Sequence, residues 1–357
     1  MTLRRVQVTD FRCLHRADLD LDPDFTLIRG PNASGKTSLL EAIYVLGRGR
    51  SFRTRRLDPL IRSGTERMMV VGEAELPERH VTLGVEGSAE GLRARVGGER
   101  VASLAELAWV LPVQIIDPEI HRLIEEGPNR RRRFIDWGVF HVEHSFVEHW
   151  QRYQQTLRQR NAALKARQSR AVVTAWDAEL VRHGESITEA RRRYIAQLAP
   201  IARSVGRHLL DLELVLAYRA GWSADLDLRA ALEGSFTRDQ ELGATQAGPH
   251  RADLAIRLEG STVRDRVSRG QQKLLAAVLL LSQIKLFPQE SRARPTLLLD
   301  DPAAELDSAH LTALLDEVRA QPLQLVVTTL QAGSGELGPF GSPGRRFEIE
   351  DGQVLEV

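Results

Sequence analysis

Cysteine is almost absent from this sequence, since Cys13 is the single one in 357 residues. One cysteine cannot form an intrachain disulfide and does not suffice for a cysteine-based metal site. Long apolar runs are lacking as well: none approaches the ~20 residues that cross a bilayer, and residues 1–10 contain no apolar signal core. We therefore expect a cytoplasmic protein without a membrane partner.

The chain also lacks an excess of charge of one sign. It has 49 Lys and Arg against 48 Asp and Glu, a formal net charge of +1. Composition alone therefore does not indicate a nucleic-acid partner, and any attraction for phosphate must come from where the charges lie. Arginines do cluster locally, as at Arg50, Arg53 and Arg55. An isolated run of this kind is, however, also typical of a solvated surface.

What the sequence does contain is a phosphate-binding loop near the N-terminus. An apolar strand-like run enters it and a helix-like run leaves it, which is the setting that the G-x-x-x-x-G-K-[ST] motif requires. Its glycines let backbone N–H groups converge on phosphate oxygens, at the positive end of the helix. We expect Lys36 to reach the β- and γ-phosphates of ATP and the Thr37 hydroxyl to bind Mg²⁺. The candidate nucleotide-binding residues are Gly30, Pro31, Asn32, Ala33, Ser34, Gly35, Lys36, Thr37 and Ser38.

A second element is the apolar run 297–299, which is followed by Asp300 and Asp301. A strand that ends in an acid delivers a carboxylate to the mouth of a parallel sheet, where Asp300 is expected to hold Mg²⁺. Asp301 is then placed to orient the attacking water or to deprotonate it as a general base. Two acids at a strand end are weak evidence alone, and they become strong evidence together with the phosphate-binding loop.

A third element, Ser268 to Gln271, opens a Leu- and Ala-rich helix expected over residues 271–286. By itself a serine in this position is typical of a helix N-cap. The element precedes the acidic strand, as the signature motif of ABC ATPases does, and it is similar to that motif except that Arg269 replaces the first glycine. The resemblance implies that Ser268, Gly270 and Gln271 meet the γ-phosphate held by the opposite subunit.

Strands and helices alternate at both ends of the chain, which indicates an α/β fold with a parallel sheet. We expect strands near residues 25–28, 110–116, 296–299 and 323–328, and a helix after the loop that ends at Gly47. In the middle, apolar residues recur every three or four positions over 146–164 and 176–205. This spacing predicts two long helices in a hairpin or short antiparallel coiled coil. Helices packed on a core, with no protruding arm, fit the spacing nearly as well.

Several short runs along the chain match a known family: 10–12, 39–43, 49–53, 127–128 with 131–136, 159–161, 248–254 and 300–307. On these runs, and over essentially its whole length, the chain resembles the RecF family of ABC-type ATPases, which is related to the heads of SMC proteins and Rad50. The resemblance implies a head of two lobes that dimerises around ATP and Mg²⁺. Residues 1–120 and 290–357 are expected to form lobe I, and residues 121–289 lobe II with the helical arm and the signature.

The resemblance also extends the list of candidate site residues. It implies that Arg12 touches the nucleotide phosphates, although a surface arginine at a strand end is an equal alternative. Gln114 is a candidate for the magnesium-sensing glutamine, and Asp307 for a contact with the opposing subunit. ABC enzymes usually place a histidine after the strand expected at 323–327. Thr328 and Thr329 stand there instead, so that role is either vacant or taken by threonine.

The leading hypothesis is an ATP-gated homodimer that binds DNA in recombinational repair and replication restart. Asp301 is one methylene shorter than the usual glutamate, which suggests slow hydrolysis. Arg50, Arg53 and Arg55 are candidate phosphate contacts to duplex, gapped or single-stranded DNA. RecR (with RecO) as partners, and a role in loading recombinase at gaps, are implied by the resemblance alone.

Two other classes compete with this hypothesis. The ATPase subunit of an ABC transporter shares the phosphate-binding loop, the signature and the acidic strand, but the long helical insertion and the missing histidine count against it. A nuclease of the overcoming-lysogenization-defect type would need an appended acidic metal-binding domain, which we do not find in the sequence.

Overall fold

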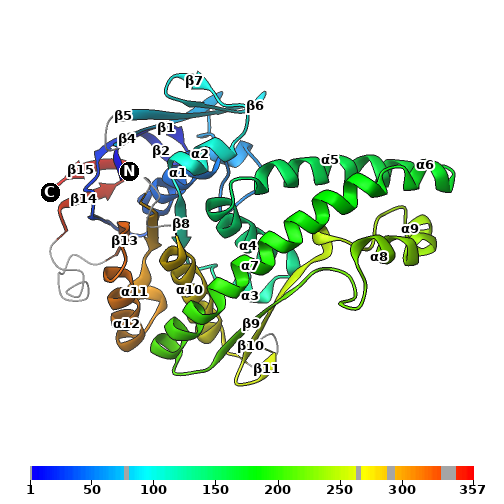
Figure 1. The fold of residues 1–357 in the computed structure, drawn as a ribbon. Coiled ribbons are helices and arrows are strands. Elements are labelled where there is room, and N and C mark those ends of the chain that lie inside the picture. Colours follow the sequence, from blue (N-terminus) through cyan, green and yellow to red (C-terminus); the bar gives the residue numbers. More distant parts are fainter. Residues whose placement is uncertain (1, 76–79, 263–266, 288–293, 331–342) are drawn as a thin grey trace. The chain divides into compact units, whose positions relative to one another are not determined.

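The computed structural model describes residues 2–75, 80–262, 267–287, 294–330 and 343–357 (Figure 1). The chain divides into two compact units. The first consists of Met1–Ile120 and Gln289–Val357, and the second of His121–Pro288. In the part of the chain that the structure describes, no helix is both long enough and apolar enough to span a bilayer.

The first unit contains two six-stranded sheets. The antiparallel sheet has the strand order β2-β1-β4-β5-β6-β7, and the other, in which only β15 runs antiparallel to its neighbour, has the order β15-β14-β3-β13-β12-β8. The strands of the antiparallel sheet are β1 (Thr2–Phe11), β2 (Leu14–Asp20), β4 (Arg67–Glu75), β5 (His80–Ser88), β6 (Gly91–Val96) and β7 (Glu99–Arg100). Those of the parallel sheet are β3 (Phe25–Arg29), β8 (Val113–Ile116), β12 (Thr296–Asp300), β13 (Gln324–Thr329), β14 (Arg345–Glu350) and β15 (Gln353–Glu356).

Helix α1 (Lys36–Arg48) packs against strands of both sheets, and its buried residues follow one another almost without interruption. Apolar side chains from Leu39 to Leu46, on several sides of the helix, are buried by this position. The prediction that α1 ends at Gly47 was wrong by one residue. Gly47 lies inside the helix, and its role is in packing: a Cβ there would lie 2.5 Å from the Leu111 carbonyl oxygen, and only glycine allows this close approach. Gly49, in the left-handed conformation at φ 60°, is the actual C-cap.

Gln324 of β13 joins the two sheets through one buried side-chain amide. Its Oε1 accepts a hydrogen bond from the Leu3 backbone N–H at 2.9 Å, and its Nε2 donates to the Leu3 carbonyl oxygen at 2.7 Å. The same Nε2 donates to the Asp22 carbonyl oxygen at 2.8 Å. Gln324 is fully buried, so these bonds replace the water that its amide would otherwise need.

The parallel α/β core expected from the sequence is confirmed, with two differences. Residues 110–116 are not one strand, because Val110 ends helix α2 (Ala105–Val110) and the chain becomes extended only at Val113. The hairpin of β14 and β15 was not predicted at all. The remaining helices of this unit are the 3₁₀ turn η1 (Asp58–Leu60), α11 (Pro302–Glu305) and α12 (Ser308–Arg319).

The second unit is built on the predicted pair of long helices, α5 (Phe146–Lys165) and α7 (Asp177–Leu210), which pack side by side. The predicted hairpin is confirmed, and a short helix, α6 (Arg170–Thr174), occupies the connection between them. The other elements are α3 (Arg122–Glu125), α4 (Pro128–Val142), α8 (Leu228–Gly234), α9 (Phe236–Leu242), the 3₁₀ turn η2 (Pro249–Arg251), α10 (Arg269–Leu286) and the three-stranded sheet of β9 (Leu214–Arg219), β10 (Asp253–Leu258) and β11 (Ser261–Thr262).

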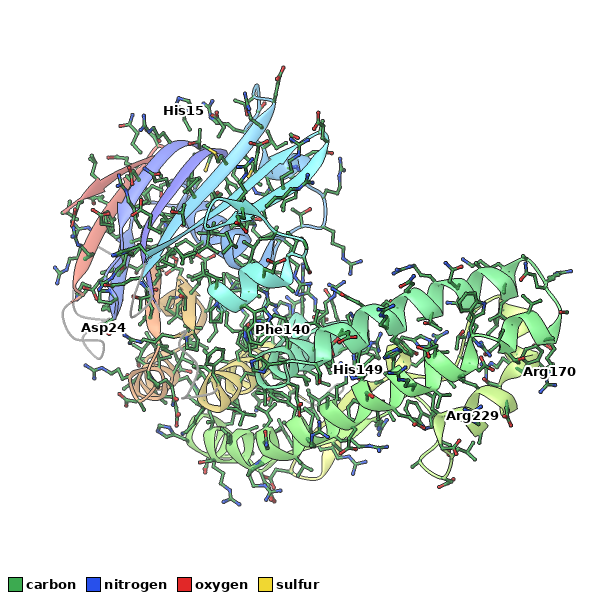
Figure 2. All side chains as sticks on the ribbon, turned by 45° about the horizontal axis from the view of Figure 1, so that its top comes forward. His15, Asp24, Phe140, His149, Arg170 and Arg229 are labelled. Carbon is green, nitrogen blue, oxygen red and sulfur yellow. The ribbon has the colours of Figure 1, made fainter. Side chains whose placement is uncertain are left out.

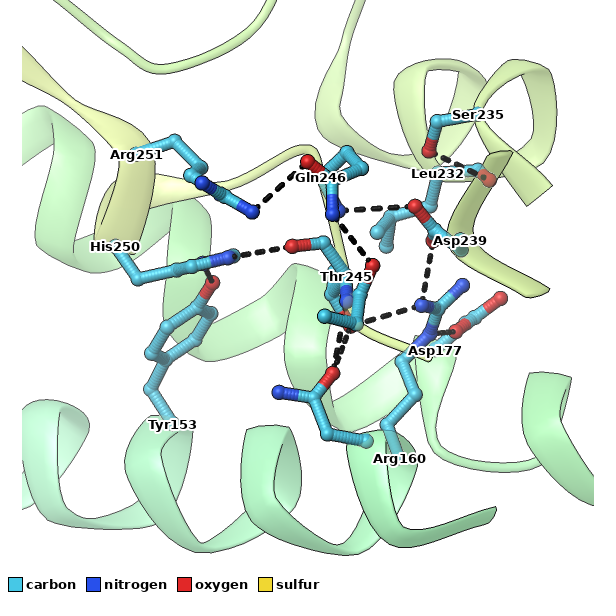
Figure 3. A network of polar contacts seen from close by, with 12 residues as sticks. Tyr153, Arg160, Asp177, Leu232, Ser235, Asp239, Thr245, Gln246, His250 and Arg251 are labelled. Carbon is cyan, nitrogen blue, oxygen red and sulfur yellow. Dashed lines mark hydrogen bonds and ion pairs between the residues drawn. The ribbon is translucent and has the colours of Figure 1, made fainter. Parts of the chain in front are cut away.

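A buried ion-pair network fixes the hairpin to the loop before η2 (Figure 3). Arg160 of α5 is fully buried and donates to Asp177 of α7 and to Asp239 of α9, each at 2.7 Å. It also donates to the Thr245 hydroxyl at 2.9 Å. Breaking a buried pair of this kind costs about 3–5 kcal/mol because the remaining charge stays desolvated. The network therefore holds three helices in one arrangement.

His250 belongs to the same network and is neutral at pH 7, because burial lowers its pKa to about 4. Its Nε2 lies 2.9 Å from the Thr245 carbonyl oxygen, which can only accept, so Nε2 carries the proton. Nδ1 then accepts from the Tyr153 hydroxyl at 2.7 Å. The sequence runs 159–161 and 248–254, which are distant in the chain, are thus brought together here.

Candidate functional site

The phosphate-binding loop connects β3 to α1 and has the backbone conformation that its glycines permit. Gly35 is the N-cap of α1 at φ 115°, a left-handed conformation that favours glycine. At Gly30 a Cβ would lie 2.2 Å from the carbonyl oxygen of Ile349, so no other residue fits against β14. Ala33 also has a positive φ of 64°. Both glycines of the motif are therefore required by geometry within this unit.

Lys36, a residue that is 7% exposed, directs its side chain back to the backbone of the loop. Its Nζ donates to the carbonyl oxygens of Gly30 at 2.7 Å and Pro31 at 2.8 Å. Burial lowers the pKa of Lys36, and the negative charges of Asp301 and Asp300 partly oppose this effect. An ammonium group in this position is poised to interact with an anion at the loop.

Thr37 and Asp300 meet at the carboxyl end of β12, as the sequence motifs predict. The Thr37 hydroxyl lies 2.9 Å from Asp300 Oδ2 and 3.1 Å from Oδ1. Thr328 of the adjacent strand β13 donates to Asp300 Oδ1 at 2.8 Å and so orients the carboxylate. A hydroxyl and a carboxylate side by side are the oxygen ligands that Mg²⁺ prefers, usually together with substrate phosphates. The side chains present therefore fit Mg²⁺ with a nucleotide.

Asp301 follows directly and has the left-handed conformation at φ 47°. Its backbone N–H lies 3.1 Å from both the carbonyl oxygen and the hydroxyl oxygen of Thr328. Burial and the charge of Asp300 raise the pKa of Asp301, while Lys36 lowers it. A carboxylate with a raised pKa next to a phosphate-binding loop is suited to act as a general base. Thr328 thus supports both acids and stands where the sequence lacks the usual histidine.

A buried acid, Glu41 of α1, is a feature of the site that sequence reasoning missed. Glu41 is fully buried, and Arg12 donates to both of its oxygens, from Nε at 2.9 Å and Nη2 at 2.8 Å. The Ser51 hydroxyl also donates to Glu41, and Arg53 Nη1 lies 3.5 Å from it. We call these four residues the Glu41 cluster. An acid inside the apolar run 39–43 was the available signal, but the sequence does not identify its partners.

The Glu41 cluster joins Arg12, a candidate for nucleotide contact, to Arg53, a candidate for DNA contact. Arg12 has a positive φ of 57° and its side chain is 19% exposed, whereas that of Arg53 is 47% exposed. Arg50 and Arg55 are exposed and make no ion pair with any residue that the structure describes. Two of the three candidate DNA contacts are therefore available to solvent, and the third is partly engaged by Glu41.

The remaining site candidates in this unit are Gln114, in strand β8, and Asp307, at the start of helix α12. The register of β8 on β12 places buried Gln114 opposite Leu297, three residues before Asp300 along the strand. Asp307 is the N-cap of α12, where it accepts from the His310 backbone N–H at 3.0 Å. Hydrogen bonds from His310 lower the pKa of Asp307, which is exposed and charged at neutral pH.

In the second unit, Ser268 begins α10 with a capping box. The Ser268 hydroxyl accepts from the Gln271 backbone N–H at 3.3 Å, and the Gln271 side chain accepts from the Ser268 N–H at 3.0 Å. Gly270 is exposed, and a Cβ added to it would meet nothing closer than 3.9 Å. Glycine in a helix costs about 1 kcal/mol relative to alanine. No contact with a residue that the structure describes explains that cost.

Comparisons with known proteins identify the family of the chain. The model of the RecF/RecN/SMC N terminal domain matches residues 2–337. The DNA replication and repair protein RecF of Stutzerimonas stutzeri is 42% identical, with 100% of this chain and 98% of the relative covered. RecF of Pseudomonas fluorescens (strain Pf0-1) is 44% identical, with 100% and 99% covered.

Solved structures extend the similarity to the fold. The structure of the recombination mediator protein RecF-ATP in the RecFOR pathway matches with a TM-score of 0.89 at 27% identity, covering 100% of this chain and 97% of that one. An SMC head domain from Pyrococcus furiosus matches with a TM-score of 0.60 at 16% identity, covering 100% and 96%, and supports the fold alone. The chain therefore belongs to the RecF family, within the wider group of RecF, RecN and SMC proteins.

Proposed function

We propose that this protein is an ATP-dependent DNA-binding protein of recombinational repair and replication restart. The observation that carries the proposal is the junction of Thr37 with Asp300, at 2.9 Å, beside a Lys36 held inside the phosphate-binding loop. Relatives called DNA replication and repair proteins match the full length of the chain. The similar structure described as RecF-ATP in the RecFOR pathway supports ATP as the ligand and RecR with RecO as partners.

In this proposal Lys36 and the N–H groups of residues 30–38 hold the ATP phosphates, with Arg12 beside them. Thr37 and Asp300 hold Mg²⁺, which neutralises charge that develops on the phosphates, and Gln114 senses it from the neighbouring strand. Asp301 accepts the proton of the attacking water. Its short side chain supports slow hydrolysis, so that ATP serves as a switch.

The site is completed by a second copy of the chain. Ser268, Gly270 and Gln271 of the opposite subunit lie at a helix N-terminus, which favours an anion, and all three are exposed. The unexplained glycine at position 270 supports close approach by another molecule. Asp307 contacts the same interface. Residues 1–120 and 290–357 serve as lobe I, and residues 121–289 as lobe II of this ATP-closed homodimer.

The alternative of a transporter ATPase subunit is not favoured. The matches are to RecF proteins over the whole chain rather than to its ATPase motifs alone. In the closed dimer, basic side chains hold duplex, gapped or single-stranded DNA and the bound protein helps to load recombinase at gaps.

Fluorescence anisotropy with labelled gapped, duplex and single-stranded DNA, with and without ATP and Mg²⁺, tests the proposed function. We expect ATP to increase the affinity for at least one substrate, together with a shift to dimer in light scattering. Equal affinity with and without ATP on all three substrates would overturn the proposal.

A further inference from the structure

The second unit contains a long stretch without a single acidic residue. No Asp or Glu occurs in residues 149–176, which cover most of α5, the connection to α7 and the short helix α6. His149 and Arg170, labelled in Figure 2, lie in this stretch. The chain as a whole has nearly equal numbers of acids and bases. The acid-free stretch is therefore a local departure from an otherwise balanced composition.

The basic residues of α5 that face solvent share one side of the helix. At 3.6 residues per turn, Arg152, Arg158 and Lys165 fall within an arc of about 140°, and all three are exposed. The buried residues Tyr153 and Leu157 lie on the opposite side, toward α7. We call this side the α5 outer face, with the exposed residues Glu148, Gln151, Arg152, Gln155, Arg158, Gln159, Ala162 and Lys165.

Cations elsewhere in this unit commonly have acidic partners. Arg193 of α7 lies 2.8 Å from Glu143, and Arg182 lies 3.6 Å from Glu179. Arg160, on the buried side of α5, is neutralised by the network described above. In contrast, Arg152, Arg158 and Lys165 form no ion pair with any of the described residues. Glu148 is the only acid of α5, so the side of the helix that carries these three cations keeps an excess of positive charge.

We propose that the α5 outer face binds the phosphate backbone of duplex DNA, an inference that rests on the proposed DNA-binding function. From Arg152 to Lys165 the helix rises about 20 Å, which matches roughly six base pairs of duplex. The glutamines between the cations donate hydrogen bonds to phosphate oxygens without reading sequence. Glu148, one turn before Arg152, is the one acid on this side of α5, and from Gln151 to Lys165 the face carries only cations, amides and an alanine. Such a face is complementary to a polyanion rather than to an ordinary protein surface of mixed charge.

The support of α5 favours such a contact. The Arg160 network and the pair of Tyr153 with His250 fix the inner side of the helix (Figure 3). Little conformational entropy is then lost when the outer side binds, beyond that of the long side chains themselves. The face is distinct from Arg50, Arg53 and Arg55, which belong to the first unit.

The test compares two triple variants of the full-length protein in the presence of ATP. R152Q/R158Q/K165Q removes the cations of the α5 outer face, and R182Q/R192Q/R193Q removes three exposed cations of α7 as a control of equal charge. Glutamine is a good helix former, so both variants should fold, and thermal unfolding and ATP binding check this. R158Q alone serves as a milder variant.

Binding to a random-sequence duplex is measured over a range of salt concentrations. We expect the plot of the logarithm of the DNA association constant against the logarithm of salt concentration to become less steep. The magnitude of its slope should decrease by about 2.7 for the α5 variant, by about 0.9 for R158Q, and little for the control. Between about 50 and about 200 mM salt, the ratio of the wild-type DNA affinity to that of the α5 variant then falls about 40-fold. A slope for the α5 variant equal to wild type, or an equal change in the control, would overturn the inference.

The outcome separates this inference from the proposed function. If wild-type protein binds DNA only with ATP but the α5 variant keeps the wild-type salt slope, the proposed function stands and the inference about the α5 outer face is wrong. An acidic protein then becomes the better partner for this face. If wild-type protein does not bind DNA at all, both the proposed function and this inference are wrong.

Discussion

Replacing Glu41 by glutamine should destabilise the first unit far more than a surface substitution of the same kind. Glu41 is fully buried and its carboxylate receives two hydrogen bonds from Arg12, whose side chain is 19% exposed. Breaking a buried ion pair costs about 3–5 kcal/mol. Glutamine retains one acceptor oxygen and Arg12 keeps some contact with water, so we expect a loss of about 2–3 kcal/mol. For a unit of this size the melting temperature should fall by about 4–12 °C.

The assay is thermal unfolding followed by calorimetry or circular dichroism. The matched control is E75Q, because Glu75 pairs with Arg4 on the surface of the same unit, where the two side chains are 38% and 40% exposed. Such a pair contributes less than about 1 kcal/mol. The double variant R12M/E41Q should recover part of the loss, since the unpaired buried charge is then removed. If E41Q lowers the melting temperature no more than E75Q does, the Glu41 cluster does not stabilise the unit as we argue.

Four further predictions concern the proposed function. K36M should abolish ATP-dependent dimerisation, because it removes the cation at the phosphates; unaltered ATP binding in equilibrium dialysis would contradict the assignment of the loop. D301N should accumulate an ATP-bound dimer in light scattering, and only monomers would count against Asp301 as the base. In wild type, hydrolysis should decline on the acid side at a higher pH than an ordinary aspartate gives, because the pKa of Asp301 is raised and the base must be deprotonated. R53Q/R55Q should lower the salt slope of DNA binding by about one unit per lost phosphate contact, and an unchanged slope would place the DNA elsewhere.

The parts of the site that could be predicted from sequence depend on local patterns. The loop at residues 30–37 and the apolar strand before Asp300 each have a signature within a few residues, and together they imply two strands of one parallel sheet, which are β3 and β12 with β13 between them. The two long helices followed from apolar spacing in the same way, because these features are set by short-range chemistry. The spacing did not decide whether the two helices form a hairpin or pack on a core, which is a matter of long-range contacts.

The missed features depend on contacts between distant residues. Nothing near Gly30 shows that the carbonyl of Ile349 lies against it, because the hairpin of β14 and β15 joins the sheet from the far end of the chain. Glu41 was visible as an acid within an apolar helix, but Arg12 and Ser51 could be identified as its partners only in three dimensions. Gly47 resembled a helix end because a glycine required by close packing and a glycine required by backbone conformation look the same in a sequence.

The amide of Gln324 has a consequence for how the first unit opens. It pairs with both backbone groups of Leu3, at the start of the antiparallel sheet, from a strand in the middle of the parallel sheet. Neither sheet can separate from the other without exposing these groups or leaving them unpaired. We therefore expect the slowest-exchanging amide hydrogens of β1 and β13 to share one opening free energy, so that the strand beside the acids of the site and the N-terminal strand unfold in a single cooperative event.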